Sequence, residues 1–319
     1  MPSDVLVFQE QKKTSGSCIF KTLKILTLLQ QSHYSSTMAS ENPSLTPWEK
    51  FASTWDEGMG DEGNDYFRYL ELPILEKLVK PAQGFRALDL ATGNGLVARW
   101  LAQKGAASVV ATDGAPAMLE YAKARTEGSA FSDRISFHCL DVTSQASWDD
   151  FIGRDLGLTD GGFDVITMNM ALMDIQDLYP LAKALKQLLK PNGCFVATLL
   201  HPIFFTSGAS RQILVHEDSE TGEHSIERSI VMTRYWNVPP AKQMVFPGRK
   251  GEAPYMYHRP LHQLFTPFFE VGLTMDALEE TNFDESFRDP VREHSSKNFT
   301  EFPKILGFRM RRLADSSSM

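Results

Sequence analysis

Between residues 85 and 200 the chain alternates short apolar runs with segments of helical periodicity, and this alternation constrains the fold most strongly. Parallel strands need a crossover connection, usually a helix, so the alternation predicts a doubly wound α/β sheet. The expected strands are Phe85–Leu90, Ser108–Thr112, Ile135–Leu140, Phe163–Met168 and Cys194–Leu200. The expected helices between them are Leu96–Gln103, a helix with Pro116 in its first turn, and Leu178–Leu189.

The segments on either side of this core extend the same domain. We expect a helix from Tyr66 to Lys80 ahead of the first strand, where apolar residues recur at helical spacing and Pro81 ends the run. Residues 201–260 break the alternation with turn sequences and short runs typical of strands. We therefore expect one domain over residues 45–319 with a β-rich insertion at 201–260. The later elements are expected at Leu261–Phe269 (helix), Met275–Leu278 and Ile305–Leu313 (strands).

Residues 1–44 differ in character from the rest of the chain. They are polar except for an apolar patch, Cys18–Leu29, which is shorter than the roughly 20 residues that a membrane span needs. The patch lacks a clean cleavage site for a secretory signal, and the segment lacks the arginines of a mitochondrial presequence. Met38 opens a stretch that resembles an ordinary protein start. We expect residues 1–44 to be a disordered or non-native extension, with residues 1–37 upstream of the native start.

Composition restricts the partners and the compartment. Forty acidic and 32 basic residues give a net charge of −8, and no basic run with interleaved aromatics is present, which disfavours a nucleic-acid partner. The three cysteines, Cys18, Cys139 and Cys194, are widely spaced and form no CxxC pattern. They predict neither a disulfide framework nor a structural metal site, and they indicate a reducing compartment, the cytoplasm. No membrane or metal partner is expected, and the oligomeric state stays open.

The first expected strand leads into the sequence Leu-Asp-Leu-Ala-Thr-Gly-Asn-Gly, residues 88–95. Ligands of such sheets bind beyond the carboxyl ends of the strands, and Gly93 and Gly95 allow close approach of the backbone to a ligand. Asp113 and Asp141 end the second and third strands. This motif resembles the cofactor-binding half of class I S-adenosylmethionine-dependent methyltransferases, and the resemblance covers roughly residues 48–313. One departure is Ala91, where the fuller family motif has glycine.

The resemblance implies a Rossmann-like, mostly parallel seven-stranded sheet, an N-terminal helical lid that includes Trp55-Asp56, and S-adenosylmethionine as methyl donor. It also implies roles for individual residues toward that donor. Asp89 would face the ammonium, with the turn glycines Gly93 and Gly95 beside it. The other implied contacts are Asp113 to the ribose hydroxyls, Asp141 to the adenine amino group, Met118 and Val142 to the ring, Asn169 and Met170 to the methyl-sulfonium region, and Tyr66 and Arg68 to the carboxylate.

Two residues are candidates for catalysis on the acceptor side. His201 follows the fifth strand and is a candidate base, the alternative being a structural role in the His201-Pro202 turn. Asp174 follows the fourth strand and would either face the acceptor or cap the next helix. His258 is a further candidate base, with the alternative of a helix entry in which Arg259 forms an ion pair. The aromatic residues expected to line an apolar acceptor pocket in the insertion are Phe204, Phe205, Tyr235, Trp236, Phe246, Tyr255 and Tyr257.

Four functions remain in competition, and one of them uses the bound donor as an electrostatic aid to a rearrangement without methyl transfer. The run from Gly93 to Ala98 also fits the GxGxxA fingerprint of dinucleotide-binding folds, but Asp89 would repel a pyrophosphate, which disfavours an NAD(P)-dependent oxidoreductase. A donor-binding protein without turnover, acting as a regulator, is the second alternative. The favoured function is methyl transfer to an oxygen, sulfur or nitrogen atom of a small molecule, because the insertion resembles small-molecule methyltransferases, including those of fungal secondary metabolism.

Overall fold

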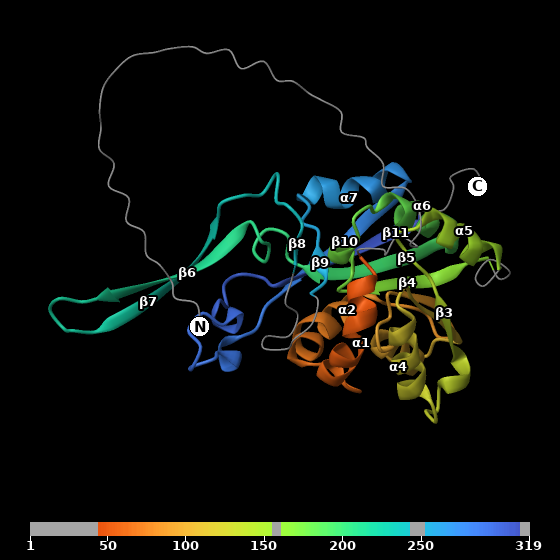
Figure 1. Ribbon diagram of the computed structural model, residues 1–319, viewed down its shortest axis with the longest axis horizontal. Helices are drawn as coiled ribbons and strands as arrows, with labels where there is room; N and C mark the ends of the chain where they lie inside the picture. The colour runs from red at the N-terminus through yellow and green to blue at the C-terminus, as the bar shows by residue number, and fades with distance from the viewer. Residues whose placement is uncertain (1–43, 155–160, 243–252, 313–319) are drawn as a thin grey trace, which may run out of the picture. The chain divides into compact units, whose positions relative to one another are not determined.

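The computed structural model describes residues 44–154, 161–242 and 253–312 (Figure 1). These residues belong to one compact unit, residues 41–319. The expected N-terminal extension lies outside the described residues, apart from Ser44. Within the described part, Cys139 and Cys194 are free thiols. No described helix has the length and apolar character needed to cross a bilayer.

Seven strands form a sheet in the order β10-β11-β5-β4-β1-β2-β3. The strands from β3 to β5 run parallel to one another, whereas β11 runs antiparallel to both β5 and β10. This arrangement confirms the predicted doubly wound, mostly parallel seven-stranded sheet. The strands are β1 (Arg86–Leu90), β2 (Ser108–Asp113), β3 (Ile135–Cys139), β4 (Phe163–Asn169), β5 (Leu189–Leu200), β10 (Leu273–Thr281) and β11 (Ile305–Arg312).

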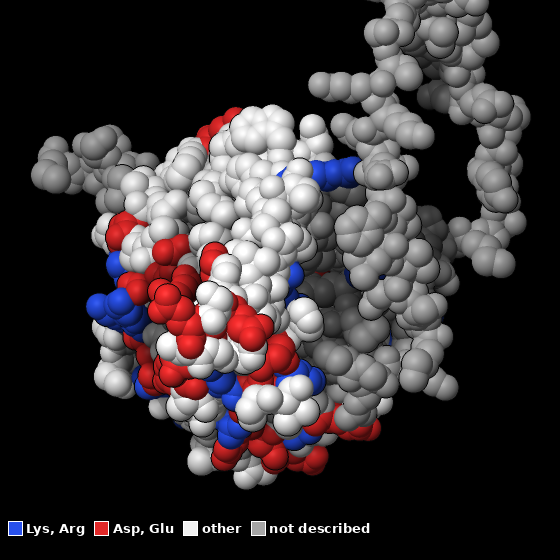
Figure 2. Space-filling view, turned by 90° about the vertical axis from the view of Figure 1, so that its left-hand side faces the viewer, with Lys and Arg blue, Asp and Glu red and all other residues white. Residues whose placement is uncertain are grey.

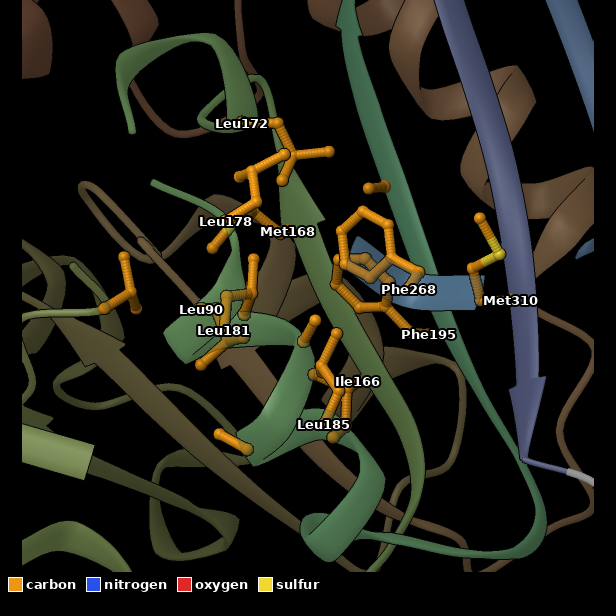
Figure 3. Packing of buried hydrophobic residues seen from close by; sticks show 14 of the residues in the cluster. Leu90, Ile166, Met168, Leu172, Leu178, Leu181, Leu185, Phe195, Phe268 and Met310 are labelled. Carbon is orange, nitrogen blue, oxygen red and sulfur yellow. The ribbon is translucent and has the colours of Figure 1, made fainter. Parts of the chain in front are cut away.

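Helices cover both faces of this sheet, as Figure 1 shows for α6 and α7 on one side and α1, α2 and α4 on the other. In the core seen in Figure 3, Ile166 and Met168 of β4 lie against Leu181 and Leu185 of α6. All four of these side chains are fully buried. The helices are α1 (Thr46–Met59), α2 (Leu72–Leu78), α3 (Leu96–Gln103), α4 (Pro116–Thr126), α5 (Gln145–Gly153), α6 (Tyr179–Leu188) and α7 (Leu261–Glu270).

Three helical elements differ from the sequence-based prediction. The helix expected from Tyr66 to Lys80 is a π-helical turn, η1 (Phe67–Glu71), followed by α2, which ends at Leu78. Helix α5 was not predicted, and α1 was expected only as a helical lid that includes Trp55-Asp56, without bounds. The start of α5 carries a recognisable signal, because the Ser144 side chain accepts a hydrogen bond from the backbone N of Ser147 as an N-cap.

The insertion after β5 contains two separate ribbons. Strands β6 (Ala209–Glu217) and β7 (His224–Met232) pair antiparallel along their whole length and extend away from the sheet in Figure 1. Strands β8 (Ala241–Lys242) and β9 (Tyr255–Met256) form a much shorter pair. The predicted β-rich insertion is confirmed, but most of the β6–β7 ribbon is exposed, and the end of the insertion near β9 is the part that contacts the loop after β4.

The side of the molecule from which this ribbon extends is predominantly acidic. Figure 2 views the molecule from that side and shows more acidic than basic side chains. Exposed acidic residues at the turn between β6 and β7 include Asp218, Glu220 and Glu223. The distribution agrees with the net charge of −8.

Candidate active site

A cavity lies at the carboxyl ends of strands β1 to β4, beside the point between β1 and β4 where the strand order reverses. Open α/β sheets bind ligands at such a point. The structure brings seven of the predicted residues together in its lining: Gly93, Asp113, Met118, Val142, Asn169, Met170 and Asp174. Six other predicted residues are not part of this lining: Tyr66, Arg68, Asp89, Gly95, Asp141 and His201.

The turn after β1 has a left-handed backbone at several positions. Gly93 (φ 57°) faces the cavity, and a Cβ there would lie 3.0 Å from Nε1 of Trp55. Gly95 (φ 81°) instead starts α3, and a Cβ there would lie 3.1 Å from the Cβ of Ala122 in α4. Gly93 therefore allows close approach at the cavity, while Gly95 allows α3 and α4 to pack closely.

Ala91, the departure from the family motif, also has a left-handed backbone (φ 52°). That conformation costs a non-glycine residue about 1–2 kcal/mol, and glycine does not incur this cost. Glycine has greater freedom in the unfolded chain, however, and the entropy that it loses on folding cancels about 0.4–1 kcal/mol of the gain. We expect Ala91→Gly to raise the free energy of unfolding by about 0.5–1 kcal/mol in urea titrations. Ala87→Gly in the buried part of β1 is the control and should lower it. A less stable Ala91→Gly protein would contradict the argument.

Two carboxyl groups support the base of the cavity. Asp89 is 1% exposed, and its oxygens accept hydrogen bonds from Oγ1 of Thr92 (2.5 Å) and Oγ1 of Thr167 (2.7 Å). Asp113 accepts from the backbone N of Gly93 and of Ala115, both at 2.9 Å, and lines the cavity. Burial raises the pKa of each carboxyl to about 6. Asp89 is thus held beneath the cavity by two threonines, and its position facing the ammonium of the donor stays a prediction.

The wall beside β3 is apolar. Met118 and Val142 are nearly fully buried and line the cavity, together with Leu140. Asp141 does not line it, because its Oδ1 accepts from the backbone N (2.9 Å) and the Oγ1 (2.6 Å) of Thr143. The carboxylate of Asp141 closes a local turn, and its contact with an adenine stays a prediction.

The end of β4 is fixed by a polar network. Nδ2 of Asn169 donates to Oε2 of Glu71 (2.7 Å), and Oδ1 of Asn169 accepts from Oγ1 of Thr198 (2.6 Å). Glu71 belongs to the π-helical turn η1, is 4% exposed, and has its pKa raised to about 7 by burial. Met170 follows with a left-handed backbone (φ 54°). Sequence reasoning did not find Glu71, whose role depends on contact between η1 and β4.

Asp174 lies in the loop after β4, in a short 3₁₀ turn, η3 (Leu172–Asp174). Capping of α6 by Asp174 is not observed: the α6 N-cap is Leu178, and Oδ1 of Asp177 accepts from the backbone N of Tyr179. The Asp174 carboxyl lines the cavity and is half-buried, and burial raises its pKa well above the usual range. Of its two predicted alternatives, the one facing the cavity is the one that its position allows.

Three predicted residues lie away from the cavity. The hydroxyl of Tyr66 is 2.7 Å from Oγ of Ser296, and Arg68 is exposed and donates to Oδ1 of Asp65 (3.0 Å). His201 is 2% exposed: its Nε2 donates to Oε1 of Glu280 (2.7 Å), while its Nδ1 accepts from the backbone N of Ile203 (3.2 Å). Both ring nitrogens are engaged beside β10, as the structural alternative for His201 requires, and its role as a base stays a prediction.

Helix α1 closes the cavity as a lid, as the resemblance implied. Leu45, Trp48 and Trp55 line the cavity, and the two tryptophan rings meet edge to face with centroids 5.5 Å apart. The lid is held by Asp56, whose carboxylate accepts from Nδ2 of Asn94 (3.1 Å) and Nη2 of Arg125 (2.9 Å). Trp48 and Leu45 were not predicted as site residues, although residues 48 and 55 share one face of a helix.

A second cavity lies on the same loop after β4. Leu172 and Met173 line it, whereas Ala171, Asp174 and Ile175 line the first. Of the aromatic residues predicted for an acceptor pocket, Phe205 and Tyr257 line this second cavity, and Phe246 lies outside the described residues.

His258 and Arg259 also line the second cavity, and both make structural contacts. Nε2 of His258 donates to the carbonyl of Tyr235 (2.7 Å), and its Nδ1 lies 2.8 Å from Oγ1 of Thr206. The Arg259 guanidinium donates to backbone carbonyls of the loop after β4, including Leu172 (3.3 Å) and Gln176 (2.8 Å). It therefore holds the loop by hydrogen bonds to carbonyls instead of the ion pair that was expected.

Comparisons with known proteins agree with this geometry. Residues 88–197 match a family model described as a methyltransferase domain. An uncharacterized protein of Haemophilus influenzae is 30% identical over 135 residues, which are 42% of this chain and 49% of that protein. A demethylmenaquinone methyltransferase of Clavibacter sepedonicus is 34% identical over 120 residues, 38% of this chain and 43% of that protein. The chain thus spans about half or less of the length of these relatives.

A solved structure extends the likeness beyond the matched segment. The S-adenosylmethionine-dependent methyltransferase from Mesorhizobium loti aligns with 76% of this chain and 97% of its own, with a TM-score of 0.55 and 23% identity. At that identity the comparison establishes the fold. Residues 88–197 are thus similar to a methyltransferase domain, and the chain shares its fold with that solved methyltransferase structure.

Proposed function

We propose that this protein transfers a methyl group from S-adenosylmethionine to a small-molecule acceptor. The observation that carries the proposal is the charge of the cavity between the glycine turn and the lid. Among the described residues that line it, Asp113 and Asp174 are acidic and none is a lysine, arginine or histidine. Such a lining suits a cationic sulfonium ligand and disfavours the phosphates of a dinucleotide.

The lining residues fit the parts of this donor. Asp113 would hold the ribose hydroxyls, Met118 and Val142 would contact the adenine, and Asn169 and Met170 would border the methyl group. Asp89 would act from beneath the cavity, because its negative charge favours a cationic ligand without direct contact. The donor supplies an activated methyl group, and the protein holds the acceptor in line with it while the lid excludes water.

The acceptor class is inferred from weaker evidence. The Clavibacter sepedonicus relative is named for demethylmenaquinone, and the second cavity of this chain is lined by apolar side chains such as Leu199 and Leu264. We propose a small molecule with an apolar body, in keeping with a role in secondary metabolism. The reducing compartment predicted from the cysteines makes the cytoplasm the proposed place of action.

Calorimetric titration with S-adenosylmethionine and, separately, NADH tests the donor. Binding of the sulfonium compound alone supports the proposal, and binding of NADH alone would restore the dinucleotide interpretation. Turnover is then tested with a panel of acceptors by mass spectrometry, in which methylation adds one CH₂ unit. Donor binding without any methylated product across the panel would favour a regulatory protein over an enzyme.

A substitution of His201 tests whether this residue belongs to the donor-binding site. His201→Ala removes two hydrogen bonds in a buried environment, and we expect the free energy of unfolding to fall by about 1–3 kcal/mol. Affinity for S-adenosylmethionine should stay unchanged, because His201 does not line the donor cavity. Urea titration and calorimetry measure the two quantities. A stable variant that has lost donor affinity would return His201 to the site.

A further inference from the structure

Asp174 differs from the other carboxyl groups at this edge of the sheet. Asp89, Asp113 and Asp141 each accept two hydrogen bonds from neighbouring protein groups. The Asp174 carboxyl accepts none from any described residue and forms no ion pair with one, although it faces the same cavity. The carboxyl is half-buried and open to the cavity, so a ligand in the cavity can supply the hydrogen-bond partner that the protein does not.

The loop that carries Asp174 is nevertheless held firmly. Arg259 donates to the carbonyls of Leu172, Ile175 and Gln176, and the backbone N of Tyr257 donates to the carbonyl of Met173 (2.7 Å). Burial without a carboxylate in contact lowers the pKa of Arg259 to about 10. The half-buried Arg259 thus holds the loop backbone, and the carboxyl of Asp174 keeps a fixed place in the lining of the cavity.

The surroundings of Asp174 favour the neutral form of its carboxyl when the cavity is empty. Burial raises the pKa of this carboxyl, and Asp113 lies in the lining of the same cavity. The elements packed against η3 are β5 and β9, and the titratable or charged residues beside η3 are Tyr255, Tyr257, His258 and Arg259, with Asp177 farther along the loop. The N–H groups of Arg259 donate to backbone carbonyls, so a positive charge in the cavity would be the strongest influence that favours ionisation of Asp174.

We propose that Asp174 receives the proton of the group that is methylated, and that the acceptor presents a hydroxyl or an amine N–H to this carboxylate. The inference rests on the proposed function. A lone pair of the acceptor oxygen or nitrogen forms the new bond to the methyl carbon as the carbon–sulfur bond breaks. The electron pair of that bond stays on sulfur, giving S-adenosylhomocysteine, and the acceptor proton moves to a carboxylate oxygen of Asp174.

This assignment narrows the acceptor class and links it to the charge of the donor. A thiol, with an ordinary pKa near 8.5, is partly ionised at neutral pH and needs a base least, whereas a hydroxyl needs one most. The sulfonium carries the positive charge that ionises Asp174, so the base becomes active only when the donor is bound. After transfer the sulfur is neutral, and the carboxyl keeps the proton until the product leaves.

The first test counts protons when donor or product binds. Calorimetry of the whole chain with S-adenosylmethionine and with S-adenosylhomocysteine, each in two buffers of different ionisation enthalpy between pH 5.5 and 8, gives the protons released. The two ligands share ribose, adenine and ammonium, so the difference between them isolates the sulfonium. We expect S-adenosylmethionine to release more protons, and its affinity to rise with pH by up to about tenfold per unit relative to the product.

Variants separate Asp174 from other titrating groups. Asp174→Asn should abolish the difference between the two ligands, whereas Asp177→Asn, an exposed change on the same loop, should retain it. Equal proton release for both ligands by the unmodified protein would overturn the inference, and so would a difference that survives in Asp174→Asn. The difference in proton release between the two ligands, measured on the wild-type protein, tests the inference even if the variant does not fold. Failure of both ligands to bind would instead refute the proposed function.

The second test uses turnover. A panel of hydroxyl, amine and thiol compounds on matched carbon skeletons is offered with S-adenosylmethionine and analysed by mass spectrometry. We expect methylation of hydroxyl or amine members, with kcat reduced about 10²-fold or more in Asp174→Asn and no longer rising with pH. Methylation of thiols alone, or a pH profile of kcat that is the same in both proteins, would contradict the role of Asp174.

Discussion

Replacing Asp113 with alanine is expected to weaken S-adenosylmethionine binding by about two orders of magnitude. Hydrogen bonds to a charged group contribute about 1.5–3 kcal/mol each, and the loss of about 3 kcal/mol corresponds to that change in Kd. The variant also leaves the backbone N–H groups of Gly93 and Ala115 without their acceptor, so the turn after β1 should loosen. Calorimetry at pH 7.5, where the carboxyl is ionised, measures the effect.

The specificity of this effect can be checked with a product and a control. S-Adenosylhomocysteine has the same ribose as the donor, so Asp113→Ala should weaken both ligands by the same factor, unlike Asp174→Asn. Asp133→Ala, at an exposed position in the connection to β3, should leave both affinities unchanged. Unaltered donor affinity in a folded Asp113→Ala protein would show that the donor does not occupy this cavity.

Glu71→Gln is expected to stabilise the protein at alkaline pH. Burial raises the pKa of Glu71 from its ordinary 4.5 to about 7, so between these values the folded protein binds a proton that the unfolded chain has lost. Stability contributed by this group is therefore fully present below pH 4.5 and is lost as pH rises through 7. The loss is on the order of 3 kcal/mol, and glutamine, which stays neutral and still accepts from Asn169, avoids it.

Urea titrations at pH 5 and pH 8 test this expectation. The free energy of unfolding of Glu71→Gln should exceed that of the wild type by about 2–3 kcal/mol at pH 8 and by much less at pH 5. The raised pKa values of Asp89 and Asp113 also make the free energy of unfolding fall as pH rises. Both residues are present in both proteins, so their effect cancels in the comparison. Glu76→Gln, which removes an exposed ion pair to Lys104, is the control. Parallel pH profiles of wild type and Glu71→Gln would refute the argument.

The strands and the cavity were largely predictable because they depend on local pattern. Apolar runs ended by Asp113 and by Asn169 placed both residues at the carboxyl edge, and the glycine turn placed Gly93 beside them. Asp89 and Asp141 also lie near strand ends, but their carboxylates accept hydrogen bonds from the hydroxyl groups of Thr92, Thr167 and Thr143. The sequence gives the position of a strand end, and it does not say which neighbour satisfies the side chain.

Contacts between distant segments could not be predicted from local pattern. The surroundings of His201 are set by Glu280 of β10 and by the backbone of Lys304, both far along the chain. Glu71 acquires its role from Asn169 in the same way. Helix α1 is a different case, because Phe51, Trp55 and Met59 recur at helical spacing, and that signal was available in the sequence.

The β6–β7 ribbon has a consequence for how this protein can be altered. Its two strands bond mainly to each other, most of their side chains face solvent, and the turn at residues 218–223 is exposed. Few contacts of the sheet depend on the outer part of the ribbon, so sequence there can change or lengthen at little cost to folding. The tip of the ribbon is consequently a permissive attachment point for a label or a fused domain, remote from the chemistry at the edge of the sheet.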